Sequence, residues 1–248
     1  MAEEFVPDVV VLCAGFGKRL RPLTETIPKA LVPVRGEPLL GHHLRAMHSA
    51  GIRRAVCVIG YLGNQVRTYV ESVRGFGIDI DFVQQDPPNG TGGAVIAATS
   101  HITTDPFAVL YSDVLFQPMT TIWLSLLRDP TAKILCARVQ DASQLGRVLF
   151  HQRPEGMVLD RIVEKDGFHS PGLVNAGLLL LPKIVLELLE KQGESPRGEV
   201  ELPPVVETLA QSGNEIHILS TERWTDIGNH HALAVAEVMV DRQEVRLD

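Results

Sequence analysis

A short apolar run at Val9–Leu12 ends in the glycine turn Gly15-Phe16-Gly17, and the cations Lys18 and Arg19 follow at once. Glycine lets a backbone turn its N–H groups toward a phosphate, and lysine and arginine neutralise the phosphate charge. In open α/β sheets ligands bind beyond the carboxyl ends of the strands, which is where this turn would lie. The segment therefore predicts an α/β fold that holds a polyphosphate.

Two familiar phosphate-binding loops do not fit this segment. A dinucleotide-binding fingerprint needs a third glycine, but this chain has Leu20 there, and Pro22 would interrupt the helix that should follow. A P-loop needs a serine or threonine after its lysine as a magnesium ligand, but Arg19 follows Lys18. On local composition alone, a solvated basic loop after a strand stays open as an alternative.

The longer pattern resembles the signature of sugar-1-phosphate nucleotidylyltransferases. It reads Ala-Gly-x-Gly-x-Arg-Leu-x-Pro-Leu-Thr over residues 14–24 and Pro-Lys-x-Leu-Val-Pro-Val over residues 28–34. The resemblance implies a Mg²⁺-dependent enzyme that joins a nucleoside triphosphate to a sugar 1-phosphate and releases pyrophosphate. It implies that Arg19 and Lys29 are catalytic, with Arg19 gripping the triphosphate and Lys29 touching the phosphates. It also implies that the loop contacts the nucleotide at Leu12, Ala14, Gly15, Gly17 and Lys18.

A second segment resembles the base-reading part of the family. Gln85 precedes Gly90-Thr91-Gly92-Gly93, and an amide that can both donate and accept a hydrogen bond suits uracil or thymine. We therefore expect Gln85, Gly90 and Thr91 to contact the nucleotide, which favours UTP or dTTP. Gln84 stays open as an alternative reader, because only one of two adjacent strand residues faces the ligand.

Two carboxylates stand in family contexts that imply Mg²⁺ ligands. Asp113 follows a buried strand in Leu-Tyr-Ser-Asp-Val, where relatives usually carry glycine before the aspartate. Asp226 lies in Trp-Thr-Asp-Ile-Gly, which resembles a late motif of the family. Magnesium prefers hard oxygen ligands, usually one or two carboxylates together with phosphates and water.

Contacts to the sugar phosphate are implied at four positions of the second half: Gly146, Glu164, Lys165 and Asn175. A glycine admits the sugar face, a carboxylate and an amide bind hydroxyls, and Lys165 can meet the phosphate. Glu199 and Glu201 resemble an acidic segment near the same pocket.

Apolar runs and helical spacing alternate along the first half, with strands expected at 9–12, 55–59, 78–82 and 107–111. A glycine turn at 89–93 is expected before a helix at 94–98. This order predicts a doubly wound, mostly parallel but mixed Rossmann-like sheet flanked by helices, of the nucleotidyltransferase type. The second half predicts strands at 134–139 and 178–181, a hairpin over 148–162, and helices at 183–191, 205–211 and 232–240.

We expect a single nucleotidyltransferase domain over residues 1–248. Its nucleotide-binding half would span 1–115, its sugar-phosphate half 116–230, and a C-terminal helix 231–248. The pairs His42-His43 and His230-His231 are expected on helix surfaces, because adjacent helical residues point about 100° apart and rarely chelate one ion.

Composition limits the partners. Thirty acidic against 23 basic residues give a formal charge of −7, which argues against nucleic acid as a partner. No run approaches the ~18–20 apolar residues of a membrane span, and the N-terminus is acidic, unlike a signal peptide. Three cysteines lie in apolar runs without a Cys-x-x-Cys motif. These features predict a cytoplasmic protein with buried reduced thiols and no membrane partner, and they are compatible with a homo-oligomer.

Other functions stay open on sequence alone. The chain could use GTP or CTP with a mannose, heptose or muramic-type phosphate, or with phosphocholine. It could also be a regulator that binds a nucleotide sugar without catalysis, or a plain α/β binding module. No Gly-x-Ser-x-Gly motif points to a serine hydrolase.

Overall fold

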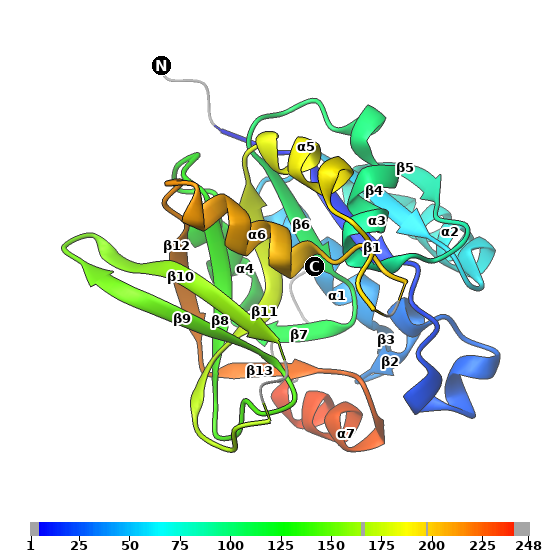
Figure 1. Ribbon diagram of the computed structural model, residues 1–248. Coiled ribbons are helices and arrows are strands. Elements are labelled where there is room, and N and C mark those ends of the chain that lie inside the picture. The colour runs from blue at the N-terminus through cyan, green and yellow to red at the C-terminus, as the bar shows by residue number, and fades with distance from the viewer. Residues whose placement is uncertain (1–4, 165–166, 197, 241–248) are drawn as a thin grey trace.

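A computed structural model describes residues 5–164, 167–196 and 198–240 of the protein. Within these ranges one large sheet holds nine strands: β1 (Val9–Cys13), β4 (Arg54–Ile59), β5 (Asp79–Gln84), β6 (Phe107–Tyr111), β8 (Lys133–Val139), β9 (Gly146–Arg153), β10 (Gly156–Glu164), β11 (Gly172–Leu181) and β12 (His217–Thr221). Their order across the sheet is β5-β4-β1-β6-β11-β8-β12-β10-β9. Figure 1 shows the sheet at the centre, with the β9–β10 hairpin projecting at one side.

The sheet is mixed, as the sequence predicts. Strands β5, β4, β1 and β6 are parallel, whereas β11 runs antiparallel to β6 and β8, and β10 runs antiparallel to β9 and β12. The expected parallel arrangement therefore describes the first half, together with the β8–β12 pair. The winding reverses at β1, so a ligand crevice forms at the carboxyl ends of β1 and β6.

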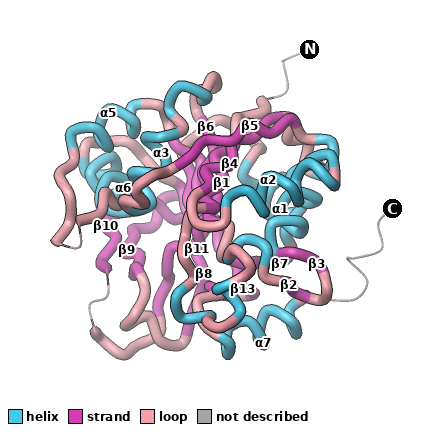
Figure 2. Tube along the Cα trace, turned by 90° about the vertical axis from the view of Figure 1, so that its right-hand side faces the viewer, coloured by secondary structure: helices cyan, strands magenta, loops and turns pink. Residues whose placement is uncertain are grey.

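Helices cover both faces of the sheet (Figure 2). One layer contains α1 (Leu39–Ser49), α2 (Gly63–Ser72) and α4 (Met119–Leu126), and the other contains α3 (Gly90–Ala97), α5 (Ile184–Lys191) and α6 (Leu202–Gln211). Side chains of a strand alternate between these two cores: Val9 and Val11 enter the first, and Val10 enters the second. Helix α7 (His230–Met239) follows the last strand.

Two small sheets and three short 3-10 turns complete the surroundings of the crevice. Strand β7 (Val114–Gln117) pairs antiparallel with β13 (Arg223–Asp226), and β2 (Pro33–Val34) pairs with β3 (Glu37–Pro38). The 3-10 turns follow β1 and span η1 (Lys18–Leu20), η2 (Leu23–Glu25) and η3 (Lys29–Leu31). The sequence did not predict β7, β12 or β13.

Helix α3 begins earlier than predicted. We expected the glycines of 90–93 to form a turn, but they form the first turn of the helix. The carbonyl of Val200 accepts hydrogen bonds from the N–H groups of Gly92 (2.8 Å) and Gly93 (3.3 Å), which caps the helix from a distant segment. The predicted C-terminal helix is described as His230–Met239, and residues 241–248 lie outside the described residues.

The first histidine pair is buried, contrary to the prediction that it lies on a helix surface. His42 is 9% exposed and His43 is fully buried, because α1 is covered by β7 and α4. His230 and His231 are exposed, as expected. The three cysteines are buried and free. In the described ranges no helix combines the length and apolar character that crossing a bilayer requires.

Candidate functional site

The glycine loop after β1 holds a conformation that only glycine adopts readily. Gly17 has a φ of +62°, and a Cβ built there would lie 2.9 Å from Cγ2 of Thr24. The Thr24 hydroxyl donates a hydrogen bond to the Gly17 carbonyl at 2.7 Å, and the Leu20 N–H donates to the same oxygen. At Gly15 a Cβ would meet nothing within 4 Å, so this side of the loop is open to a ligand.

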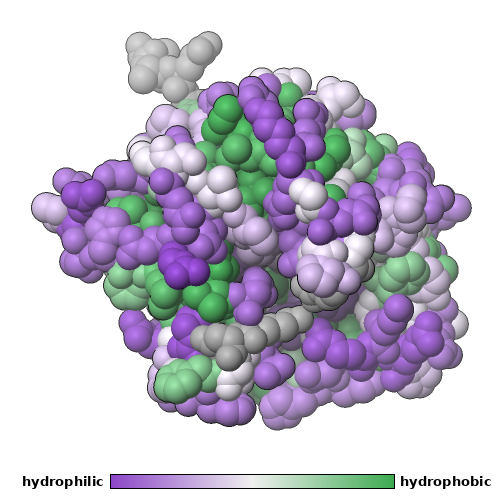
Figure 3. Space-filling view, viewed as in Figure 1, coloured by the Kyte–Doolittle hydropathy of each residue, from purple (hydrophilic) through white to green (hydrophobic). Residues whose placement is uncertain are grey.

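The loop forms one wall of a cavity of about 700 Å³. The cavity lies at the carboxyl ends of β1 and β6, at the point where the winding of the sheet reverses. Eleven predicted site residues line it: Leu12, Ala14, Gly15, Lys18, Arg19, Lys29, Gln85, Gly90, Thr91, Asp113 and Glu164. Hydrophilic side chains cover most of the molecular face in Figure 3.

Lys29 lies between two carboxylates beside this cavity. Its Nζ is 2.5 Å from Oδ2 of Asp113 and 3.6 Å from Oδ1 of Asp226, and its side chain is only 11% exposed. Asp226 is not part of the cavity lining, but this shared ammonium joins it to Asp113. Residues that are far apart in the sequence therefore form one charged cluster.

Backbone pairing sets the separation of the two aspartates. Asp226 pairs with Val114 in the β7–β13 sheet, and the Ile227 N–H donates to the Asp113 carbonyl at 2.8 Å. The indole N–H of Trp224 donates to the carbonyl of Ala176 at 3.1 Å and anchors β13 on the main sheet. The aspartates are therefore held by the strands that carry them as well as by side-chain contacts.

Ser112 has a structural role that the sequence did not reveal. Its hydroxyl donates to the Leu12 carbonyl at 2.6 Å, and its N–H reaches the same oxygen at 3.3 Å. Both bonds tie the end of β6 to the end of β1. The serine that stands where relatives usually carry glycine thus fixes the turn that presents Asp113.

Burial and charge move the pKa values of this cluster in different directions. Burial alone would lower the pKa of Lys29, but the charges of Asp113 and Asp226 raise it above its usual value. Burial would raise the pKa of Asp113, and Lys29 outweighs this effect and lowers it. Burial and the charge of Asp113 raise the pKa of Asp226. At neutral pH the cluster has two acids for one buried ammonium.

The two aspartates fit a hard divalent cation such as Mg²⁺. They supply carboxylate oxygens only, and among the described residues Oδ1 of Asp226 is buried without a hydrogen-bond partner. Within the same ranges no group of three or more His, Cys, Asp or Glu side chains could hold a metal. Any cation here would therefore share this pair with oxygens of a substrate.

Gln85 lies at the opposite side of the cavity and is 6% exposed. Its Nε2 donates to Oδ1 of Asn89 at 2.8 Å and to the carbonyl of Gly90 at 3.0 Å. Because a carbonyl can only accept, this orientation of the amide is fixed and both of its N–H groups are engaged. In the structure only the oxygen of this amide is left for a ligand, and the contact of Gln85 with a base stays a prediction. Gln84 is exposed and does not line the cavity.

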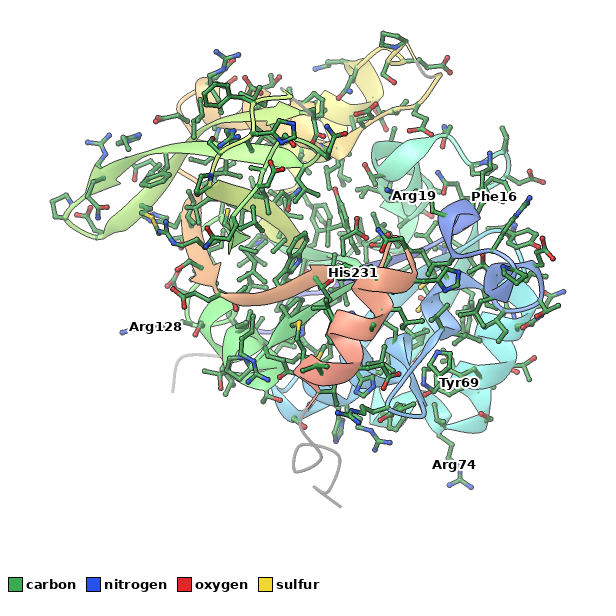
Figure 4. The ribbon with its side chains drawn as sticks, turned by 90° about the horizontal axis from the view of Figure 1, so that it is seen from below. Phe16, Arg19, Tyr69, Arg74, Arg128 and His231 are labelled. Carbon is green, nitrogen blue, oxygen red and sulfur yellow. The ribbon has the colours of Figure 1, made fainter. Side chains whose placement is uncertain are left out.

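Arg19 projects from η1 at the mouth of the cavity and is exposed. It passes close to the segment after β13, since a Cβ on Gly228 would lie 2.9 Å from one of its guanidinium nitrogens. Figure 4 shows Arg19 and Phe16 at the same edge of the molecule. The Phe16 ring packs on Tyr61 with centroids 5.4 Å apart, and Nζ of Lys18 lies 5.5 Å from its centre.

Of the predicted sugar-binding residues that the structure describes, only Glu164 lines the cavity. Glu164 lines the cavity, and Gly146 pairs with it across the β9–β10 hairpin, where a Cβ would lie 2.5 Å from a Glu164 carboxylate oxygen. Asn175 does not line the cavity, and its Oδ1 accepts the Gly177 N–H at 3.0 Å. Gly17 is likewise behind the lining, and Lys165 lies outside the described residues.

The cavity also contains residues that the sequence did not single out as binding residues. Glu199 and Glu201 line it as the acidic segment suggested, and the remaining lining residues are Cys13, Phe16, Pro88, Ala94, Tyr111, Ser112 and Pro203. Tyr111 directly precedes Ser112-Asp113, and burial raises the pKa of its hydroxyl. Only its position next to Ser112-Asp113, the predicted metal-binding motif, could have indicated Tyr111 from the sequence.

Comparison with known proteins gives several relatives at similar identity. The chain is 33% identical over 226 residues to the bifunctional protein GlmU of Methanococcus vannielii, covering 89% of this chain and 52% of that protein. It is 30% identical to a mannose-1-phosphate guanyltransferase of Gibberella zeae (88% and 60% covered). It is 29% identical to a glucose-1-phosphate thymidylyltransferase of Streptomyces antibioticus (96% and 68% covered). The chain spans about half the length of the GlmU proteins it matches.

Solved structures of other proteins share the fold. A UDP-glucose pyrophosphorylase complexed with UDP-glucose superimposes with a TM-score of 0.83 at 20% identity, covering 94% of this chain and 98% of that one. This likeness confirms the predicted mixed α/β nucleotidyltransferase fold. The model of the nucleotidyl transferase family matches residues 8–243. The chain, with its glycine loop at the end of β1 and its cavity there, belongs to the nucleotidyl transferase family.

Proposed function

We propose that the protein transfers a nucleotidyl group from a nucleoside triphosphate to a sugar 1-phosphate and releases pyrophosphate. The observation that carries the proposal is the Lys29 ammonium held between Asp113 and Asp226 beside a cavity walled by the glycine loop. A binding module would have no need to hold one largely buried lysine between two half-buried acids at this edge. The names of the Gibberella and Streptomyces relatives support the same reaction class.

In this mechanism a phosphate oxygen of the sugar 1-phosphate attacks the α-phosphorus of the nucleoside triphosphate. The bond between that phosphorus and the oxygen that bridges to the β-phosphate breaks, and pyrophosphate leaves. The attacking oxygen is already anionic, so no general base is needed. Arg19 balances the charge that grows on the pyrophosphate leaving group, and Lys29 aligns the attacking phosphate. Asp113 and Asp226 would hold Mg²⁺, which supplies charge neutralisation at the phosphates.

For the base we propose uracil or thymine, with guanine as the second candidate. The free oxygen of Gln85 can only accept a hydrogen bond, and the ring N–H of uracil, thymine or guanine can donate one. Cytosine could donate to this oxygen only through its exocyclic amine, because its pairing edge has no ring N–H. The thymidylyl- and guanyltransferase relatives at 29% and 30% identity do not separate the two candidates.

The test is a matrix of five nucleoside triphosphates against a panel of sugar 1-phosphates with Mg²⁺, measured by pyrophosphate release. We expect release with UTP or dTTP and one or a few sugar phosphates. No release anywhere in the matrix, combined with tight nucleotide-sugar binding in solution, would instead support a regulator without catalysis. Release only with CTP would contradict the proposed uracil, thymine or guanine base.

A charge-removal pair tests the role of Arg19. Arg19→Ala is expected to lower kcat by about 10²–10³-fold or more, because a donor to developing charge is lost. Arg128→Ala is the matched control, since Arg128 projects from the far side of the molecule in Figure 4 and does not line the cavity. Near-normal turnover of Arg19→Ala would remove Arg19 from the mechanism.

A further inference from the structure

Residues 192–196 and 198–201 connect α5 to α6 and lie along the first turn of α3. We call these residues the strap. Figure 1 shows it in yellow beside α3 and β1. It carries Glu199 and Glu201, which line the cavity and which the proposed function places on its acceptor side. Helix α3 carries Gly90 and Thr91, which line the nucleotide side. The two sides of the cavity therefore meet where the strap touches α3.

Backbone hydrogen bonds clamp the strap to α3 in both directions. The Val200 carbonyl accepts from Gly92 (2.8 Å) and Gly93 (3.3 Å), and the Val200 N–H donates to the Asn89 carbonyl at 2.8 Å. Just beyond the strap, the Leu202 N–H donates to the Thr91 hydroxyl at 3.0 Å. Helix N–H groups that could have faced a ligand are thus used to hold the strap.

The glycines of this turn are required by the strap. A Cβ on Gly90 would lie 2.5 Å from the Val200 carbonyl oxygen, and one on Gly92 would lie 2.9 Å from the same oxygen. The Gly92 Cβ would also lie 2.8 Å from Cδ2 of Leu189, which is 1% exposed. Since neither the carbonyl nor the buried leucine can move freely, a side chain here must push the strap away.

The clamp continues to Gln85, which we propose reads the base. Gln85 donates to Asn89 and to the Gly90 carbonyl, and Asn89 in turn receives the Val200 N–H. We infer that Val200 is a positioning residue that couples the base-reading side of the cavity to Glu199 and Glu201, so that nucleotide binding sets the acceptor wall. The assignment of the acceptor rests on the proposed function, whereas the coupling of the two segments does not.

Gly92→Ala tests this coupling, with Gly193→Ala as the matched control. Neither glycine has a positive φ, and a Cβ on Gly193, which lies in the strap itself, meets nothing within 4 Å. We expect Gly92→Ala to raise the KM for the sugar phosphate at saturating nucleotide about fivefold or more, within the usual range of coupling energies, and to change the Kd of the nucleotide alone less than about twofold. Gly193→Ala should change neither constant. Equal changes in both constants, or none, would overturn the inference.

A second measurement does not depend on turnover. Hydrogen–deuterium exchange of the wild type with nucleotide alone should protect the amides of residues 198–202 together with those of 90–93, and Gly92→Ala should lose the protection of 198–202. If 90–93 are protected and 198–202 are not in the wild type, the clamp does not transmit binding. If the strap is protected but no acceptor gives pyrophosphate, the coupling stands and the proposed function fails. If Gly92→Ala does not fold, a second pair of variants replaces it. Thr91→Val removes the hydroxyl that accepts the Leu202 N–H, and Thr91→Ser keeps it.

Discussion

Lowering the pH from 7 to 5 is expected to remove about 2 kcal/mol from the free energy of unfolding through His43 alone. Burial, offset only in part by the hydrogen bond to Val114, lowers the pKa of His43 from 6.5 to about 4. Its Nε2 lies 2.8 Å from the Val114 carbonyl and must be the protonated nitrogen, while Nδ1 is buried without a partner among the described residues. The folded protein therefore keeps the ring neutral.

The sign follows from the lowered value. The unfolded chain binds a proton near pH 6.5 and the folded chain only near pH 4, so stability is full above 6.5 and falls as the pH drops toward 4. A gap of about 2.5 pKa units at 1.36 kcal/mol each sets the total loss at about 3 kcal/mol. Most of this loss lies between pH 6.5 and pH 4, and the part down to pH 5 is about 2 kcal/mol.

Urea unfolding at pH 7, 6 and 5 measures this loss. The His43→Gln side chain cannot titrate. Between pH 7 and pH 5 the variant should therefore lose about 2 kcal/mol less unfolding free energy than the wild type, whatever its stability at pH 7. His231→Gln, at an exposed position, should follow the wild type. Parallel curves for the wild type and His43→Gln would refute the reasoning. An NMR titration of His43 in the wild type, expected to have its midpoint near pH 4, decides the matter if the variant does not fold.

Three further substitutions have expected outcomes. Gly17→Ala should cost about 1–2 kcal/mol and lower kcat, because a residue with a side chain is strained at a φ of +62° and its Cβ would press on Thr24; urea unfolding and pyrophosphate release measure both. Asp8→Asn should cost about 2 kcal/mol at pH 7, because Asp8 accepts hydrogen bonds from both N–H and hydroxyl of Thr103. Although burial opposes it, these bonds lower the pKa of Asp8 below 3.8. Its contribution is therefore full above pH 3.8 and is lost as the pH falls through the lower folded pKa, so the stability difference between the variant and the wild type should shrink as the pH is lowered below 3.8. Trp224→Phe should cost about 1 kcal/mol by leaving the Ala176 carbonyl without its donor, and an unchanged urea midpoint would contradict the anchoring of β13.

The first half of the fold could be predicted from the sequence because its signals are local. The strands at β1, β4 and β6 are short apolar runs, and the glycine turn after β1 follows directly in the chain. Their parallel order then places the loop and Asp113 at one edge by the rules of doubly wound sheets. Ten of the predicted site residues in this half line the cavity for this reason, although their roles remain predictions.

What could not be predicted depends on partners far away in the chain. Gly90–Gly93 has the composition of a turn and becomes helical because Val200, more than a hundred residues later, caps it. Strands β7 and β13 have four residues each and exist because they pair with one another. His43 has the polarity of a surface residue, and its burial is made tolerable by one carbonyl of β7. None of these contacts has a signal within its own segment.

The spacing of Asp113 and Asp226 is set by the paired strands β7 and β13 and not by the longer segments around the cavity. The pairing of β7 with β13 and the shared contact with Lys29 hold the two aspartates, while the β9–β10 hairpin and the strap are attached elsewhere. We therefore expect that residues added at the Pro154–Gly156 turn would leave the gap between Asp113 and Asp226 unchanged. We also expect the hairpin and the strap to tolerate sequence change or exchange by engineering, while the β7–β13 pairing keeps the two aspartates in register.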